Sequence, residues 1–121
     1  MLAEIKKVRQ IPNEGFRRWY TDADNDLIVW FEQDSIVGFQ LCYDKATTER
    51  AITWFRKGGF VHTRVDSGEP AMGGPKRTPV LISDGVFDCD AVCDRFRRIA
   101  VRVEPDIADF IVKKLLEYPK A

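Results

Sequence analysis

The sequence predicts an α+β fold: an antiparallel β-meander of four to five strands, followed by two C-terminal helices packed on one sheet face. Two apolar segments, residues 27–31 and 36–43, have the length and composition of strands. Gly58-Gly59 separates two further strand-like segments, and apolar residues near the C-terminus recur at helical spacing. Strands followed by helices are typical of an α+β domain with an antiparallel sheet.

A chain of 121 residues favours a single domain, 1–121. Residues 1–66 are expected to be mostly strands and residues 80–121 mostly helical. The segment 67–79 between them holds three prolines and three glycines, so we expect a loop, for which a lid or a partner-binding role is plausible.

The first elements are less clear than the later ones. Residues 1–11 fit either a strand or a short helix, because Ile5, Arg9 and Ile11 share strand parity whereas Ile5 and Val8 also suit a helix. Residues 12–15 are typical of a turn. The aromatic-rich residues 16–20 then predict a strand.

The apolar run 27–31 predicts an interior strand. Leu27, Val29 and Phe31 are expected on one face, with Ile28 and Trp30 on the other, because side chains alternate along a strand. Residues 36–43 are expected to pair with this run as a hairpin across residues 33–35. The register of that hairpin stays open, and a slip of one residue would exchange the faces.

Residues 50–57 and 60–66 predict a second hairpin, in which Gly58-Gly59 forms a two-residue turn. This loop places Phe55 opposite His62 and Trp54 opposite Thr63. One face then carries Ile52, Trp54, Val61 and Val65. The other face carries a mixed polar and aromatic set: Thr53, Phe55, Phe60, His62 and Arg64.

Two helices are expected near the C-terminus. Residues 79–82 suit a short strand or the approach to a helix, and Asp84-Gly85 suits a turn. Asp88 is a good N-cap for a helix that runs to about Val101. A second helix is expected from Pro105, a favoured first helical residue, to the stop at Pro119.

Two helices cover one face of such a sheet and leave the other incompletely covered. We therefore expect a non-enzymatic binding or protein-interaction module that uses the second face. The expected contact residues are Phe55, Phe60, His62 and Arg64, with Trp30 or Phe31 beneath them. The expected partner is a second copy in a homodimer, an unknown protein or a small molecule.

Two other functions are considered. A small enzyme, a hydrolase or an isomerase, would use His62 as a general base, because a histidine titrates near neutral pH. Its cleft would be closed by the 67–79 loop. Single-stranded nucleic-acid binding would use either Arg17 with Trp19 on one face, or Phe16 with Arg18 and Tyr20 on the other. A formal net charge of zero makes nucleic acid an unlikely partner.

No metal or cofactor is expected. Asp22, Asp24 and Asp26 match half of a calcium loop, but the glycine and the glutamate that the loop needs are missing. Cys89 and Cys93 lie four residues apart on an apolar stripe, which favours core packing. Residues 68–78 differ from a phosphate-binding loop because a proline separates the glycines from the lysine.

Composition indicates a cytoplasmic protein with reduced thiols. The three cysteines, an odd number in a small chain, do not suggest a disulfide framework. Residues 1–13 lack the apolar core of a signal peptide. The longest apolar run is far below the roughly 20 residues that span a bilayer, so no membrane association is expected.

A group of small bacterial proteins of unknown function resembles this chain. The resemblance rests on Trp19-Tyr20, Asp26–Trp30 and Ile36–Asp44, and extends to Ala51–Trp54 and Arg64–Asp66. It spans roughly residues 19–66. It implies a stand-alone bacterial protein and brings no catalytic residue or ligand with it.

Overall fold

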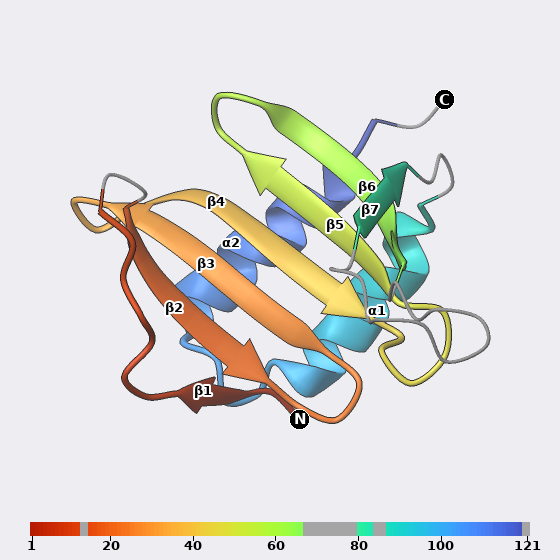
Figure 1. The fold of residues 1–121 in the computed structure, drawn as a ribbon, viewed down its shortest axis with the longest axis horizontal. Coiled ribbons are helices and arrows are strands. Elements are labelled where there is room, and N and C mark those ends of the chain that lie inside the picture. Colours follow the sequence, from red (N-terminus) through yellow and green to blue (C-terminus); the bar gives the residue numbers. More distant parts are fainter. Residues whose placement is uncertain (13–14, 67–79, 84–86, 120–121) are drawn as a thin grey trace, which may run out of the picture.

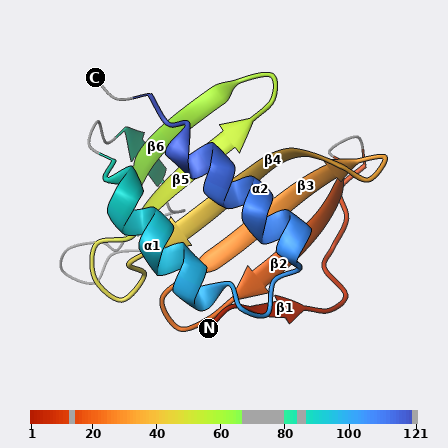
Figure 2. The same cartoon turned by 180° about the vertical axis from the view of Figure 1, so that it is seen from behind.

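A computed structural model describes residues 1–12, 15–66, 80–83 and 87–119. Over these residues the chain forms one seven-stranded antiparallel sheet, in which the strands follow one another in sequence order (Figure 1). Both helices lie across the same face of this sheet (Figure 2). Neither helix is long and apolar enough to cross a membrane.

The elements confirm the α+β class, the antiparallel meander and the two C-terminal helices. The strands are β1 (Ala3–Ile5), β2 (Phe16–Thr21), β3 (Asp26–Glu32), β4 (Ser35–Tyr43), β5 (Arg50–Phe55), β6 (Gly59–Asp66) and β7 (Val80–Ser83), and the helices are α1 (Cys89–Ile99) and α2 (Pro105–Leu116). The predicted number of four to five strands is too low. The short flanking segments β1 and β7 pair with β2 and β6, and such short strands leave little pattern in a sequence.

Strand β3 is an interior strand, as predicted. It pairs with β2 on one side and with β4 on the other. Leu27 and Val29 are fully buried towards the helices, and Phe31 packs against the same core. Ile28 and Trp30 therefore point to the opposite face, in agreement with the predicted alternation.

The β3–β4 hairpin turns at two residues, Gln33 and Asp34, which both have positive φ (48° and 69°). Such values are typical of the primed turns that join antiparallel strands. Glu32 pairs with Ser35, and the register then shifts between Trp30 and Phe31, so that Trp30 lies opposite Gly38. This irregularity settles the register that the sequence left open.

The predicted register of the β5–β6 hairpin is wrong. Phe55 lies opposite Gly59 instead of His62, and His62 lies opposite Ile52. Only Gly59 of the two glycines has positive φ (69°), and the turn closes through the Gly58 N–H, which donates to the Phe55 carbonyl (3.0 Å). The shift of three residues is odd, so it exchanges the faces of β6 relative to β5.

The hydrophobic core lies between the sheet and the two helices. Asp88 caps α1, as predicted, by accepting a hydrogen bond from the Ala91 N–H (3.1 Å). Cys89 and Cys93 are buried on the sheet side of α1. The largest fully buried side chains from both layers are Tyr20, Phe39, Phe96, Leu2, Leu27, Leu41, Ile52, Ile111 and Leu115.

A polar network ties the start of α2 to the first two strands. Arg18 donates to both oxygens of Glu4 (2.8 and 2.7 Å) and to Glu104 (2.8 Å). The Tyr20 hydroxyl donates to the second oxygen of Glu104 (2.5 Å). Burial raises the pKa of Glu104, but the Tyr20 hydrogen bond, a backbone N–H and the charge of Arg18 outweigh it, and the net pKa is lowered.

Candidate functional site on the open sheet face

The sheet face turned away from the helices is the candidate site. We define the open face as the side chains that point to this side from β2 to β6 and remain at least partly accessible. The cross-strand register identifies them as Arg17, Trp19, Thr21, Asp26, Ile28, Trp30, Gln40, Cys42, Thr53, Phe55 and Val61. Within the described part of the chain, no helix packs on this face.

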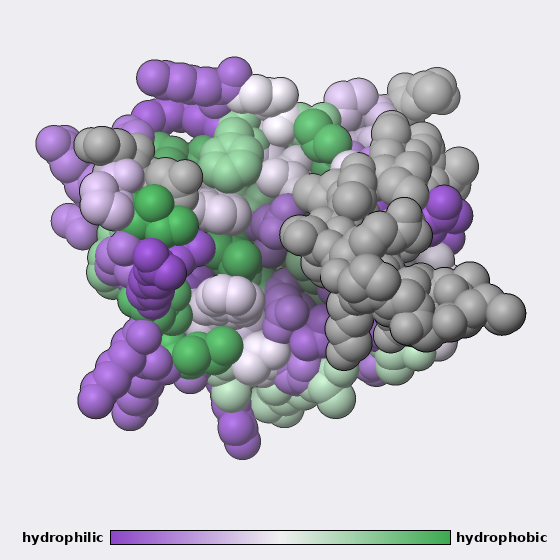
Figure 3. Space-filling view, in the orientation of Figure 1, coloured by the Kyte–Doolittle hydropathy of each residue, from purple (hydrophilic) through white to green (hydrophobic). Residues whose placement is uncertain are grey.

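Hydrophobic and hydrophilic side chains are mixed on the open face (Figure 3). Phe55 is 37% exposed and Val61 is 51% exposed, whereas the two tryptophans and Ile28 are half-buried. Ala51 and Thr63 point to the same side but are buried. The accessible surface therefore lies on β2–β4, at the Phe55 end of β5 and at Val61 of β6.

An aromatic cluster forms one end of the open face. The rings of Trp30 and Phe55 pack at a centroid distance of 5.0 Å. Phe55 also lies directly over Gly38, where an added Cβ would overlap its ring. The glycine thus allows the Phe55 ring to lie flat across β4, between β3 and β5.

Arg17 lies at the same end of the face as the aromatic cluster. Its backbone is held by the Gln10 side chain, which accepts from the Arg17 N–H (2.8 Å) and donates to its carbonyl (3.0 Å). The guanidinium donates to the Arg9 carbonyl. Among the described residues it makes no ion pair, so a positive charge remains at this end.

The other end of the open face is acidic. Asp26 accepts from Thr21 (2.5 Å) and pairs with Lys45 (3.1 Å). Burial raises the pKa of Glu49, and the nearby Asp26 raises it further. Burial, then Glu49 and Asp26, raise the pKa of the Cys42 thiol to about 12. Two carboxylates and one lysine therefore surround a protonated thiol.

The structure separates the four predicted contact residues. Phe55 lies on the open face, with Trp30 against it as one of the two predicted alternatives. Phe60, His62 and Arg64 point to the helix side instead, because the register of β6 differs from the prediction. The prediction that these four side chains form one surface is wrong.

His62 belongs to an aromatic cluster under the helices. It is 4% exposed, and its Nε2 lies 2.5 Å from the Tyr43 hydroxyl. The Phe87 ring lies 4.9 Å from the imidazole, and Tyr118 connects Phe87 to Phe60. These contacts are those of a side chain that packs the end of the core.

Trp19 and Val61 are open-face residues that the sequence analysis did not assign to the predicted surface. Trp19 follows from the alternation of β2, since it shares parity with Arg17 and lies opposite Ile28. Val61 was assigned to the covered face through the wrong hairpin register. The 67–79 loop, with the phosphate-loop-like residues 68–78, lies outside the described residues, as does the Asp84-Gly85 turn.

No group of three or more His, Cys, Asp or Glu side chains in the described ranges is placed to hold a metal ion. Asp22, from the calcium-like motif, instead accepts from the backbone N–H groups of Asp24 (2.9 Å) and Asn25 (2.7 Å). It also pairs with the N-terminal amine (3.2 Å). The Asp22 carboxylate is therefore used by contacts within its own turn and with the N-terminus.

Hollows also lie away from the open face, at the β3–β4 turn and between the two helices. A hollow of about 610 Å³ at the turn is lined by Phe16 and Phe31 together with the polar side chains of Glu32, Gln33, Ser35 and Arg56. Arg56 and Glu32 already form an ion pair there (3.5 Å). A hollow of about 520 Å³ runs between α1 and α2.

No family model, curated protein or solved structure gives a significant match to this chain.

Proposed function

We propose that the protein is a non-enzymatic interaction module and that the open face is its binding surface. The observation that carries this proposal is the aromatic content of that face: Trp19, Trp30 and Phe55 remain accessible on the side opposite the helices. A sheet face that only meets water normally carries polar side chains instead. The unpaired thiols of all three cysteines favour a reducing, cytoplasmic setting.

The composition of the open face matches the centre of protein–protein interfaces. Trp, Phe and Arg are enriched at such centres, and they supply most of the binding energy. Gln40 and Thr53 are joined by a hydrogen bond (3.0 Å) in the middle of the face, so these polar groups are already oriented. A protein surface is therefore the partner that this face fits best.

The enzyme hypothesis has less support. A general base must reach the proton that it abstracts, and the imidazole of His62 is buried against Tyr43 and Phe87. We expect His62→Phe to lower the stability of the fold.

Single-stranded nucleic-acid binding is the second candidate. Arg17 and Trp19 share the open face, and Trp30 and Phe55 add two further rings on which bases could stack. The carboxylates of Asp26 and Glu49 on the same face oppose a phosphate backbone. Because of this repulsion, nucleic acid is a less favoured partner for the open face than a protein.

Native mass spectrometry of the purified full chain tests the proposal. The informative variant is Val61→Glu, which puts a charge on the open face. Its matched control is Val101→Glu, on a valine that is 70% exposed beyond α1. We expect the wild type and the control to retain a bound species that Val61→Glu loses.

A wild-type protein that is bare and monomeric at every concentration would contradict the proposal, as would a Val61→Glu variant that keeps the bound species. Salt-sensitive quenching of tryptophan fluorescence by an oligonucleotide would favour the nucleic-acid candidate instead.

A further inference from the structure

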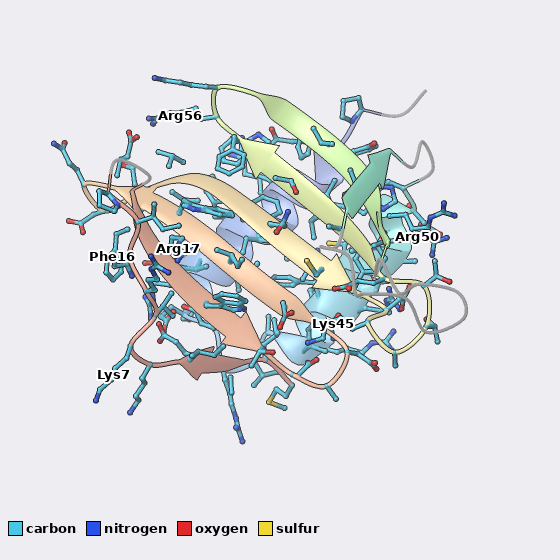
Figure 4. All side chains as sticks on the ribbon, viewed as in Figure 1. Lys7, Phe16, Arg17, Lys45, Arg50 and Arg56 are labelled. Carbon is cyan, nitrogen blue, oxygen red and sulfur yellow. The ribbon has the colours of Figure 1, made fainter. Side chains whose placement is uncertain are left out.

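We infer that the open face binds an extended, acidic segment of a partner protein. This inference rests on the proposed function and names the chemistry of the partner. Its basis is a cluster of cations beside the aromatic cluster, which we call the basic corner: Lys6, Lys7, Arg9 and Arg17. Figure 4 shows Lys7 and Arg17 on the side of the sheet where the β1–β2 connection runs.

Hydrogen bonds hold the β1–β2 connection along the margin of the open face. Ile5 pairs with Trp19, and four residues later the Arg9 carbonyl accepts a hydrogen bond from the Arg17 guanidinium. The Gln10 side chain then bonds both backbone polar groups of Arg17 (2.8 and 3.0 Å). The segment between these contacts, which carries the two lysines of the basic corner, therefore runs beside β2.

The charges of the basic corner are not neutralised within the described part of the chain. Lys6, Lys7 and Arg9 are exposed, and no member of the corner forms an ion pair with another described residue. Glu4, their neighbour in the chain, pairs with Arg18 instead (2.7 Å). The chain as a whole has a formal net charge of zero, so the corner is a local excess of positive charge. Such an excess attracts a negatively charged partner.

The same region has more hydrogen-bond donors than acceptors. Arg17 Nε and Trp19 Nε1 are buried and have no hydrogen-bond partner among the described residues. Leaving a buried N–H group unpaired is unfavourable. A carboxylate is purely an acceptor, and it can accept two hydrogen bonds from one arginine. An acidic side chain is therefore the kind of group that this region lacks.

The aromatic cluster lies in the same cross-strand row as the basic corner. From β2 to β5, this row consists of Arg17, Trp30, Gly38 and Phe55. Three strand spacings of about 4.8 Å place Phe55 about 14 Å from Arg17. An extended segment covers this distance in about four or five residues. We therefore expect the partner segment to carry acidic residues about four positions from an apolar or aromatic one.

The acidic end of the open face limits where the partner can be acidic. Asp26 pairs with Lys45 there (3.1 Å), and burial and then Asp26 raise the pKa of Glu49. A negative charge is repelled at this end and attracted at the basic corner. A nucleic-acid strand carries a phosphate at every nucleotide, whereas a protein segment can place its carboxylates at the basic corner alone. The charge distribution therefore favours a protein segment.

Selection of random peptides of about 12 residues, displayed on phage, against the immobilised full chain tests the inference. We expect the selected peptides to carry at least two Asp or Glu residues, about four positions from Leu, Phe, Tyr or Trp. A labelled copy of the commonest peptide is then titrated by fluorescence anisotropy. We expect Arg9→Glu to weaken its binding about fivefold or more, and Phe55→Ala to weaken it by a similar factor.

The matched control is Arg102→Glu. It makes the same change of charge at an exposed arginine that lies between the two helices, away from the open face. We expect this variant to bind the peptide within about twofold of the wild type. Circular dichroism checks that each variant is folded, and Lys7→Glu takes the place of Arg9→Glu if the latter does not fold.

A selection that yields no peptide, or peptides without acidic residues, would overturn the inference, as would equal effects of Arg9→Glu and Arg102→Glu. Peptides that lack acidic residues but no longer bind Phe55→Ala would leave the proposed function standing. Tighter binding of a thymidylate oligonucleotide than of any selected peptide would overturn the protein partner in favour of nucleic acid. A failed selection together with a bare, monomeric wild type in native mass spectrometry would contradict the proposed function as well.

Discussion

The two faces of the same strands differ in chemistry as well as in burial. On the helix side, β3 and β4 contribute Leu27, Val29, Phe39 and Leu41, all buried and without polar atoms. On the open side, the same two strands carry Asp26, Ile28, Trp30, Gln40 and Cys42, all partly accessible. The comparison indicates that one face is built to hold the fold together, whereas the other resembles the centre of an interface.

The largest expected difference between the faces is in stability. Phe39 and Phe55 are the same residue on opposite faces, 0% and 37% exposed. Phe39→Ala leaves a cavity in the core and is expected to lower the free energy of unfolding by about 3–5 kcal/mol. Phe55→Ala is expected to lower it by about 1–2 kcal/mol, because its ring is only partly buried. Urea denaturation measures both, and equal losses would remove the distinction between the faces.

The contact between Phe55 and Gly38 gives the next largest effect. Gly38→Ala places a methyl group where the Phe55 ring lies, and is expected to cost about 1–3 kcal/mol. In a Phe55→Ala background the same substitution should cost little, since the ring that it displaces is gone. A double-mutant cycle measures this coupling. An unchanged cost in both backgrounds would show that something other than Phe55 occupies the space.

The polar network on the helix side predicts a smaller effect that depends on pH. The pKa of Glu104 is lower in the folded state, so its contribution to stability is present above its unfolded pKa, about 4.3, and is lost as the pH falls through the folded pKa. Because Glu104 is partly exposed, Glu104→Gln is expected to cost only about 0.5–1 kcal/mol at pH 7.

Urea denaturation of the wild type and Glu104→Gln at pH 7 and pH 3 measures this dependence. The difference in free energy of unfolding should shrink towards zero at pH 3. A difference of equal size at both pH values would assign the effect to packing instead of charge.

Most of the architecture could be predicted from local patterns. The alternation over residues 27–31 identified the interior strand and its two faces, and Asp88 and Pro105 marked the helix starts. The binding surface could not be predicted in the same way, because it depends on the pairing between strands. The pair Gly58-Gly59 favours a two-residue turn, but in the structure only Gly59 has positive φ. The strands then pair in a register that differs by an odd number of residues, and this register turns His62 to the helix side.

The smallest expected effect is on thiol reactivity at the acidic end. Burial, Glu49 and Asp26 hold the pKa of Cys42 at about 12, so little thiolate forms at pH 8. We expect Cys42 in the native protein to react with a thiol reagent far more slowly than a free cysteine. Glu49→Gln should accelerate the reaction severalfold, because it removes one carboxylate.

Peptide mass mapping identifies the modified cysteine and distinguishes Cys42 from the buried Cys93. A Cys42 thiol that reacts at the rate of free cysteine would contradict the buried, acidic environment described for it.

Hydroxyl-radical footprinting of dilute and concentrated protein tests most directly whether the open face is the binding surface. Trp30 and Phe55 report on the open face, whereas Leu116 and Val101 are exposed on the helix layer. We predict that concentration protects Trp30 and Phe55 and leaves Leu116 and Val101 unchanged. Protection confined to Leu116 and Val101 would contradict the account, as would no protection at any concentration in a protein that also retains no bound species.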